Sequence, residues 1–284
     1  VHLWLTENKI VSNAAKTIGA NEIWETIRSE VRREATREPL LASFLHSTVL
    51  NHDTLEDAIS YHLAGKLADV SVSSMLIREV IDEALAGDPL IRDAIRRDIQ
   101  AVRDRDPASD CYYVPFLFFK GFHSLQSYRV AHWLWRQDRK ALALHLQSRI
   151  SEVFGADIHP AARIGKGILI DHGTAVVIGE TAVVEDNVSM LHEVTLGGTG
   201  KQTGDRHPKV RHGVLIGAGA KILGNVEIGT GAKVASCSVV LDDVPAHCTV
   251  AGIPAKIVGR LSVAEPALDM DHMLPHHHAD GSGI

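Results

Sequence analysis

A six-residue period in the second half of the sequence constrains the fold more than any other feature. Aliphatic side chains recur at every sixth position between residues 158 and 240, in three sets that are each in phase. The sets are Ile158, Ile164 and Ile170; then Ile178, Val184, Met190 and Leu196; then Val210, Ile216, Ile222, Ile228, Val234 and Val240. This period fits neither an α-helix nor an alternating strand. It is typical of a hexapeptide parallel β-helix, in which three short strands and their turns close one triangular coil.

Glycine follows the aliphatic residue at several of these positions, as in Ile164-Gly165 and Ile216-Gly217. Glycine tolerates the sharp backbone turns that the corners of such a coil require. We therefore predict a core that grows by stacking one coil on the next. A conventional β-sandwich is the alternative.

The first half of the chain shows helical spacing instead. Ile23, Ile27 and Val31 recur at helical intervals, and Gly87-Asp88-Pro89 predicts the end of one helix and the start of another that runs to about Arg105. Residues 121–149 predict a single longer helical segment.

The predicted fold class is therefore α+β, with an N-terminal α-helical domain followed by a left-handed parallel β-helix. The helical domain covers residues 1–150, with the assignment of residues 1–20 left open. The β-helix covers residues 151–260, and residues 261–284 are predicted to form a flexible C-terminal tail.

Charge and cysteine content exclude several classes of function. The formal net charge is −6, which disfavours nucleic acid or an anionic membrane as a partner. No apolar stretch is long enough to span a bilayer, and the first residues lack the basic-then-apolar order of a signal peptide. Cys111, Cys237 and Cys248 suggest neither a disulfide framework nor a zinc motif, which fits a reducing, cytoplasmic compartment.

The phase of the repeat slips by two residues between the first and second sets, and again between the second and third. An insertion in a rigid repeat must loop outward, and loops on rigid scaffolds often carry function. The larger interruption spans Gly197 to Lys209 and contains Arg206 and His207.

A histidine at the first slip is a candidate general base. His172 follows Asp171 there, and histidine suits proton transfer near neutral pH. A carboxylate on the second ring nitrogen would fix the tautomer, and Asp157, earlier in the repeat, is a candidate for that role. Asp106 precedes Pro107 in the helical half. For the histidine and aspartates of the repeat a solvent-exposed turn is the alternative interpretation, and for Asp106 it is a turn that ends a helix.

Five segments together resemble the serine acetyltransferase family of hexapeptide-repeat acyltransferases, and the resemblance covers roughly residues 21–260. The segments are RDPASD, FFKGFHSLQSYRVAHWLW, VFGADIHPAARIGKGILIDHGTAVVIGETAVV, VTLGGTGKQTGDRHPKVRHGVLIGAGAKILGN and AGIPAKIVG. A helical domain in front of the β-helix is also the arrangement of that family. The resemblance implies a serine O-acetyltransferase, which transfers acetyl from acetyl-CoA to the hydroxyl of L-serine in the first step of cysteine biosynthesis.

The resemblance also implies roles for individual residues. His172 matches the family's general base, and Asp157 matches the carboxylate that orients it. Four further positions match the serine-binding residues: Asp106 and Asp171 for the amino group, Arg206 for the carboxylate, and His207 as a second histidine that contacts substrate. A zwitterion needs both signs of charge nearby, and guanidinium pairs well with carboxylate.

Acetyl-CoA is implied as a co-substrate rather than a permanently bound cofactor, and no metal site is predicted. In the family its groove lies along the β-helix between neighbouring subunits. The matching positions here are Gly198, Ala218, Gly219, Lys233 and Ser236, with Lys256 and Arg260 as candidates for the coenzyme phosphates.

The resemblance further implies a homohexamer made of two trimers, and feedback inhibition by cysteine in the serine site. The family's C-terminal tail ends in isoleucine and can enter the active site of O-acetylserine sulfhydrylase. Here the chain ends at Ile284, and binding through a terminal carboxylate and one apolar side chain is a known mode of recognition.

Three other functions compete with this interpretation. His172, His207 and His212 have a spacing reminiscent of the zinc-binding histidines in hexapeptide-repeat carbonic anhydrases. A non-catalytic scaffold that tethers a partner through its tail is the second. The third keeps acetyl-CoA but replaces serine with homoserine, a sugar or an antibiotic.

Overall fold

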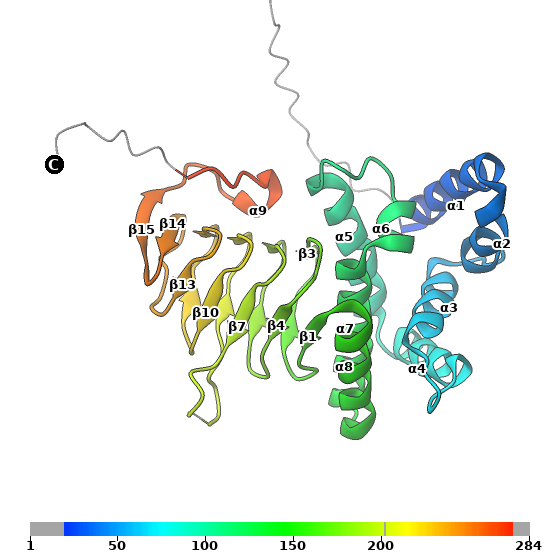
Figure 1. Ribbon diagram of the computed structural model, residues 1–284, viewed down its shortest axis with the longest axis horizontal. Helices are drawn as coiled ribbons and strands as arrows, with labels where there is room; N and C mark the ends of the chain where they lie inside the picture. The colour runs from blue at the N-terminus through cyan, green and yellow to red at the C-terminus, as the bar shows by residue number, and fades with distance from the viewer. Residues whose placement is uncertain (1–19, 202, 275–284) are drawn as a thin grey trace, which may run out of the picture.

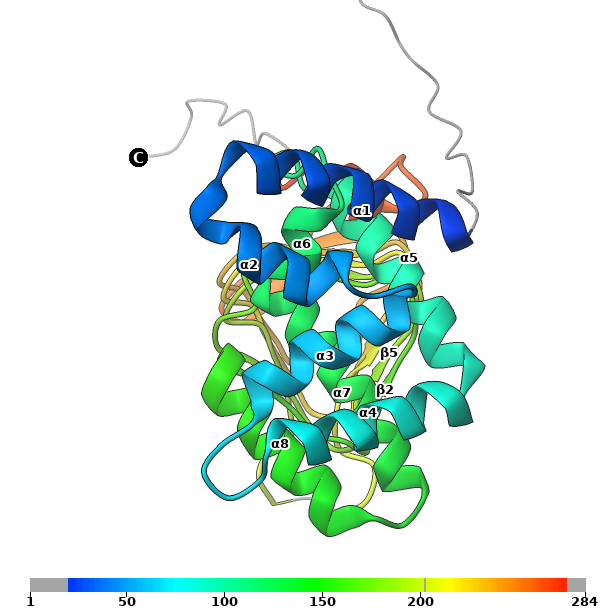
Figure 2. The same ribbon diagram turned by 90° about the vertical axis from the view of Figure 1, so that its right-hand side faces the viewer.

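The computed structural model describes residues 20–201 and 203–274, in which a helical half is followed by a solenoid of short strands (Figure 1). The helical half contains α1 (Ala20–Arg37), η1 (Pro39–Leu41), α2 (Ala42–Leu45), η2 (His46–Leu50), α3 (Leu55–Leu67), α4 (Ser74–Gly87), α5 (Pro89–Arg105), α6 (Tyr113–Phe118), α7 (Lys120–Arg136) and α8 (Lys140–Phe154). The helices stand together at one end of the solenoid, and Figure 2 views them in front of the coils.

Local signals in the sequence placed several helix ends correctly. Ile23, Ile27 and Val31 are all buried on one face of α1. The helix stop at Gly87 is confirmed, because Asp88 caps α5 by accepting a hydrogen bond from the Leu90 amide at 2.9 Å, with Pro89 in the first turn.

The prediction of one long helix over residues 121–149 is wrong. The chain turns between α7 and α8, where Asp138 adopts a left-handed conformation with φ 58°. The two helices then pack against each other as an antiparallel pair. The helical half also extends to Phe154, beyond the predicted boundary at residue 150.

The solenoid is built from three parallel sheets, which confirms the predicted β-helix. Sheet A contains β1 (Ala156–Ile158), β4 (Val176–Ile178), β7 (Thr195–Gly197), β10 (Lys221–Leu223) and β13 (Val239–Val240). Sheet B contains β2 (Arg163–Ile164), β5 (Val183–Val184), β8 (Lys209–Val210) and β11 (Glu227–Ile228). Sheet C contains β3 (Leu169–Ile170), β6 (Ser189–Met190), β9 (Leu215–Ile216), β12 (Lys233–Val234), β14 (Cys248–Gly252) and β15 (Ala255–Arg260), the last antiparallel. The left-handed sense of winding stays a prediction.

The in-phase aliphatic residues fill the interior, where all are buried except the partly buried Ile164. The register joins the three sets into columns, since Ile178 pairs with Ile158 and with Leu196. Each slip of phase is therefore an enlarged corner and not a break in the stack. The phase slip of two residues at the second interruption holds, but the inserted segment is longer, because the described residues between β7 and β8, 198–201 and 203–208, form a single corner.

Two sets of corners matter for the site. Corner 1 is the column of turns from sheet C to sheet A, at residues 171–175, 191–194, 217–220 and 235–238. Corner 2 is the column of turns from sheet A to sheet B, at residues 159–162, 179–182, 198–208, 224–226 and 241–243.

Helix α7 joins the two halves, because its side chains enter both cores. Leu125 and Tyr128 pack into the solenoid core, and the Tyr128 hydroxyl donates to the carbonyl of Ala162. Beside them Arg129 of α7 pairs with the fully buried Asp98 of α5 at 2.6 Å. The same guanidinium donates to the carbonyl of Gly165 at 2.7 Å, so one buried ion pair links two helices to the first coil.

The chain after β15 differs from the predicted tail. Residues 261–274 return along the coils and include α9 (Pro266–Asp269), whose Ala267 is fully buried. Residues 275–284, with Ile284, lie outside the described residues. Across residues 20–201 and 203–274, every helix is too short or too polar to cross a bilayer.

Candidate active site

His172 occupies the first turn of corner 1 in a conformation that presents its imidazole to solvent. Its backbone is left-handed, with φ 59°, and its side chain is 69% exposed. The following Gly173 lies against the start of α7, where a Cβ would come within 2.8 Å of the Gly121 Cα. This close approach of helix and coil fixes the turn that carries His172.

Two groups flank the imidazole of His172. A carboxylate oxygen of Asp171 lies 3.6 Å from its Nε2. The ring of His192, in the same position one coil further along, lies 5.6 Å away at 70° to it. The Nδ1 atom of His192 is buried without a hydrogen-bond partner among the described residues.

The two acids that the resemblance assigned to the amino group of serine line one cavity. Asp171 reaches it from corner 1, and Asp106 reaches it from the end of α5, where its carboxylate accepts from the Ala108 amide at 2.9 Å. The cavity has a volume of about 570 Å³, and Arg105 and His272 also line it. Residues far apart in the sequence thus place Asp106 and Asp171 around one space, which Asp104 and Asp269 also line, and Asp171 connects this space to His172.

Asp157 is not hydrogen-bonded to His172 in the described chain. It lies one coil earlier, on β1, which pairs directly with β4. Its Oδ1 accepts a hydrogen bond from the Gln147 side chain of α8 at 2.7 Å. The expected contact between the Asp157 carboxylate and the His172 imidazole is therefore not made in a single chain. The Oδ1 atom of Asp157 is instead held by Gln147 of the helical half.

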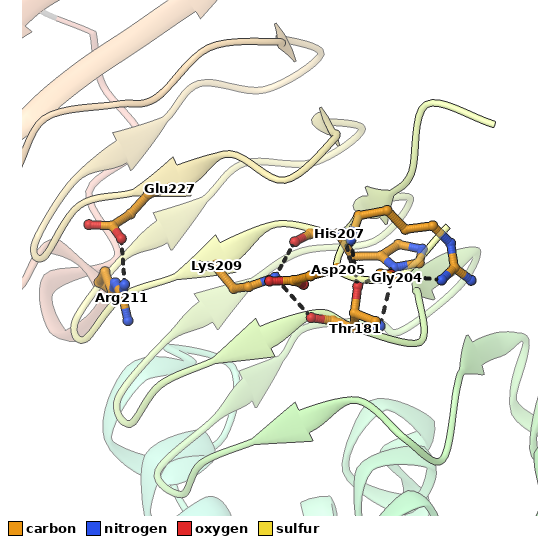
Figure 3. A network of polar contacts seen from close by, with 8 residues as sticks. Thr181, Gly204, Asp205, His207, Lys209, Arg211 and Glu227 are labelled. Atoms are coloured by element: carbon orange, nitrogen blue, oxygen red, sulfur yellow. Dashed lines mark hydrogen bonds and ion pairs between the residues drawn. The ribbon is translucent and has the colours of Figure 1, made fainter. Parts of the chain in front are cut away.

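Arg206 and His207 lie together in corner 2 and are held by the neighbouring coil. The Arg206 guanidinium pairs with Glu180 at 2.6 Å, and this hydrogen bond keeps the pKa of the Glu180 carboxyl below its usual range. His207 is buried against Thr181, whose hydroxyl and amide both meet its Nδ1 (Figure 3). Burial, followed by the positive charge of Arg206, lowers the pKa of His207.

The residues predicted to bind the coenzyme fall into separate groups. Ala218, Gly219 and Ser236 continue corner 1 beyond His172, whereas Gly198 begins the enlarged turn of corner 2. Lys256 is exposed on β15. Lys233 is different from the others, because it is buried on sheet C and its Nζ donates to the carbonyl of Met273 at 2.6 Å.

The three histidines of the zinc alternative lie in three different columns of turns within one chain. His172 lies in corner 1 and His207 in corner 2, while His212 lies in the third column of turns and contacts Glu265 at 3.3 Å. Within residues 20–201 and 203–274, no group of His, Cys, Asp or Glu is arranged to hold a metal ion.

Four residues near the candidate site were not predicted from the sequence: His192, Thr181, Glu180 and His272. A signal for His192 was present, since it follows Met190 by two positions just as His172 follows Ile170. Thr181 and Glu180 are identified only by the contacts they make across coils, and His272 only by the return of the chain over the cavity.

Comparison with known proteins gives matches over nearly the whole chain. A model of the serine acetyltransferase N-terminal region matches residues 23–127, and a model of the bacterial transferase hexapeptide repeat matches residues 207–242. The serine acetyltransferase of Salmonella typhimurium is 56% identical over 265 residues, which cover 92% of this chain and 97% of that protein.

Solved structures agree with these matches. A serine acetyltransferase in complex with cysteine superposes with a TM-score of 0.89 at 54% identity, over 90% of this chain and all of that one. The serine acetyltransferase of Brucella abortus in complex with coenzyme A superposes with a TM-score of 0.83 at 53% identity, over 84% of this chain and 96% of that one.

Proposed function

The chain belongs to the serine acetyltransferase family, and from that membership we propose how its residues divide the work of acetyl transfer. The reaction moves an acetyl group from acetyl-CoA to the hydroxyl of L-serine and forms O-acetylserine, the precursor used in cysteine biosynthesis. The observation that carries the residue assignment is the cavity shared by Asp106 and Asp171 beside His172. Two carboxylates suit the ammonium group of an amino acid, whose hydroxyl then lies near the imidazole.

His172 is the proposed general base. Its imidazole takes the proton of the serine hydroxyl while that oxygen attacks the thioester carbonyl of acetyl-CoA. The tetrahedral intermediate then collapses, the carbon–sulfur bond breaks, and the proton passes to the thiolate of coenzyme A. Asp157 is the proposed orienting carboxylate, because Gln147 holds its Oδ1 and leaves Oδ2 to accept from the imidazole.

Arg206 and His207 are the proposed partners of the serine carboxylate. Both present hydrogen-bond donors, but they lie in corner 2, at the other end of the short strands of sheet A. A three-residue strand such as β4 separates the corners by roughly 10 Å. Within the described residues, no hydrogen bond, ion pair or ring contact joins His172 of corner 1 to Arg206 or His207 of corner 2. One complete site therefore combines corner 1 of one chain with corner 2 of a neighbour.

This requirement supports a trimer around the solenoids, and a hexamer in which helical halves join two trimers. A closed ring gives every chain the same pair of contacts, so all sites are completed together. The coenzyme is proposed to lie between chains along corner 1, near Ala218, Gly219 and Ser236, with Gly198 from the neighbour and Lys256 near the phosphates. Lys233 could join this groove only after releasing Met273.

Cysteine is proposed as a feedback inhibitor in the serine site, since it differs from serine only in sulfur for oxygen. A relative bound to cysteine supports this assignment. The C-terminal Ile284 is proposed to bind O-acetylserine sulfhydrylase. A cytoplasmic location completes the proposal, because the three cysteines are unpaired and suit a reducing compartment.

A thiol-release assay tests the function directly. The purified full-length chain is mixed with acetyl-CoA and serine, and free coenzyme A is measured over time. We expect release that depends on serine and exceeds the rate with homoserine, a sugar or no acceptor. Equal release with homoserine would move the assignment to another acceptor, and no release with any acceptor would leave the scaffold alternative.

A further inference from the structure

The hydroxyl of Thr181 lies at the centre of corner 2. Its Oγ1 accepts hydrogen bonds from the backbone amides of Arg206 at 3.0 Å and His207 at 3.1 Å. The same oxygen lies 2.9 Å from the Nδ1 atom of His207, and the Thr181 backbone amide lies 3.2 Å from that nitrogen (Figure 3). One residue therefore contacts both the backbone and the imidazole of the predicted carboxylate-binding pair.

These contacts determine where the protons lie. A hydroxyl has one proton to donate and two lone pairs that accept. Both lone pairs of Thr181 Oγ1 accept from amides, and its one proton has two acceptors within reach, His207 Nδ1 and the Asp205 carboxylate. The backbone amide of Thr181 can only donate, so it settles the role of Nδ1. The Nδ1 atom accepts from this amide and carries no proton, so the neutral ring is protonated at Nε2.

The surroundings favour the same neutral form. The charged and titratable groups that act on the imidazole are Arg206 and Lys209 on the cationic side, with Glu180 and His159 facing it. Burial and the two cations lower the pKa of His207, while Glu180 opposes them. A second proton would also displace the donors at Nδ1.

The Nε2 edge of the ring points between two glycines. A Cβ at Gly179 would come within 2.1 Å of Nε2, and a Cβ at Gly198 within 3.5 Å. Among the described residues, none accepts a hydrogen bond from Nε2. The glycines hold the ring in a slot, and its Nε2–H edge is left for a ligand.

We propose that Thr181 is a positioning residue that fixes His207 as the Nε2–H tautomer, so that corner 2 offers a substrate carboxylate donors and no base. This inference rests on the proposed function for the identity of the ligand, an amino acid with a free carboxylate. It assigns proton abstraction to His172 alone, since a ring already protonated at Nε2 cannot accept the hydroxyl proton there.

A matched pair of variants tests the role in catalysis. Thr181→Val keeps the shape of the side chain but removes the hydroxyl. The backbone amides of Arg206 and His207 then lose their acceptor, and His207 Nδ1 keeps only the backbone amide of residue 181 as a donor. We expect the KM for serine to rise about tenfold, as for a lost hydrogen bond, with kcat and the KM for acetyl-CoA changed less than about threefold. Thr181→Ser keeps the hydroxyl and should restore the KM for serine to within about twofold.

The tautomer gives a readout that does not depend on turnover. Full-length protein labelled with ¹⁵N-histidine is measured by solid-state NMR, and the signals of His207 are assigned by their loss in His207→Gln. Between about pH 6 and pH 8 we expect an unprotonated Nδ1 and a protonated Nε2. A proton on Nδ1 in that range would overturn the proposal even if serine is the substrate. If His207 shows the predicted tautomer but the protein does not acetylate serine, the proposed function is rejected and the tautomer assignment stands.

Two controls separate positioning from general damage. Thr249 also has a buried hydroxyl, but one without a hydrogen-bond partner among the described residues. Thr249→Val should therefore leave the KM for serine unchanged. In a His207→Ala background, Thr181→Val should raise the KM for serine by less than about threefold, because the contact to the imidazole is already gone and only the two backbone amide contacts of the hydroxyl remain to be lost. Equal effects with and without His207, or an equal effect at Thr249, would contradict the inference.

Discussion

The two halves of the molecule differ in whether ionisable groups enter the hydrophobic core. The helical half buries several of them, including the edge-to-face pair His62 and His123 and the ion pair of Asp98 with Arg129. The interior of the solenoid contains aliphatic side chains, and His172 and Arg206 stand at its corners. Burying a polar group is costly unless it is paired, so the helical core depends on specific contacts that the solenoid core does not need.

The difference teaches how each half can contribute to the function. Because the coils are held by stacked aliphatic residues, a corner can change or enlarge without disturbing the core, as residues 198–208 do. The helical half supplies fixed points instead. It delivers Asp106 to the cavity and Gln147 to Asp157. We therefore expect corner substitutions to affect activity and helical-core changes to affect stability.

The largest effect should come from His172→Ala in corner 1. Loss of a general base typically costs 10²–10⁴-fold in rate, so we expect kcat to fall by roughly that factor. The fold and oligomeric state should not change, because the side chain is 69% exposed. Thiol release and size-exclusion chromatography check both expectations.

A matched control is His247→Ala, which removes an imidazole from the third column of turns. Its kcat should stay within about twofold of the starting protein. A His172→Ala variant with near-normal kcat would reject the assignment of His172 as the base. A variant that unfolds or dissociates would contradict the expectation that corner substitutions leave the solenoid core intact.

Acid should destabilise the helical half before the solenoid. Burial lowers the pKa of His62 to about 4 and that of His123 to about 3, from an ordinary value of 6.5. Between pH 6.5 and the lowered values, the unfolded chain binds protons that the folded chain does not. Stability therefore falls as pH falls, by about 2 kcal/mol per histidine at pH 5.

Tryptophan fluorescence can follow this effect, because the three tryptophans that the structure describes, Trp24, Trp133 and Trp135, all lie in the helical half. Urea unfolding by this signal should shift to lower urea between pH 7 and pH 5. The variant His123→Gln, which can still donate to the Phe116 carbonyl, should reduce the shift by about half. An unchanged shift would show that these buried imidazoles do not titrate as expected.

The same contrast explains what could be predicted from the sequence. Each coil contacts mainly its neighbours, so the positions from Ile158 to Val240 revealed the β-helix through local spacing alone. The helical half depends on contacts between distant segments. The turn at Asp138 that separates α7 from α8 left no glycine or proline signal, and the prediction of one helix failed there.

For the candidate site too, local sequence motifs were informative and contacts between distant segments were not visible in the sequence. Family motifs predicted roles for His172, Arg206 and His207, and these roles stay predictions. Asp106 and Asp171, to which the motifs assign one role, line a common cavity. The placement of His172 and Arg206 in different corners depends on three-dimensional stacking, which motif order does not contain. Thr181 was missed for the same reason, since its partners lie on the next coil, 25 and 26 positions away.

Mixing two variants asks whether the corners work within one chain or between chains. Arg206→Ala should raise the KM for serine by about 10–100-fold, because it removes a charged partner of the carboxylate. Coexpressed with His172→Ala, it should recover about a quarter of the normal rate at low serine, since one random interface in four joins two intact corners. The two proteins purified separately and assayed without subunit exchange are the control. No recovery after coexpression would place the whole site in one chain.

The smallest effect concerns Thr249, where the solenoid departs from its own pattern. Its hydroxyl on β14 is fully buried and has no hydrogen-bond partner among the described residues. Removing a buried, unpaired hydroxyl should relieve its desolvation cost, so Thr249→Val should raise the free energy of unfolding by about 1 kcal/mol. Urea unfolding followed by the far-ultraviolet signal of the strands measures this. Thr195→Val, at a half-buried position on β7, should stay within about 0.5 kcal/mol. A destabilised Thr249→Val would mean that its hydroxyl finds a partner in the assembled protein, and the solenoid would then also rely on buried polar pairing, as the helical half does.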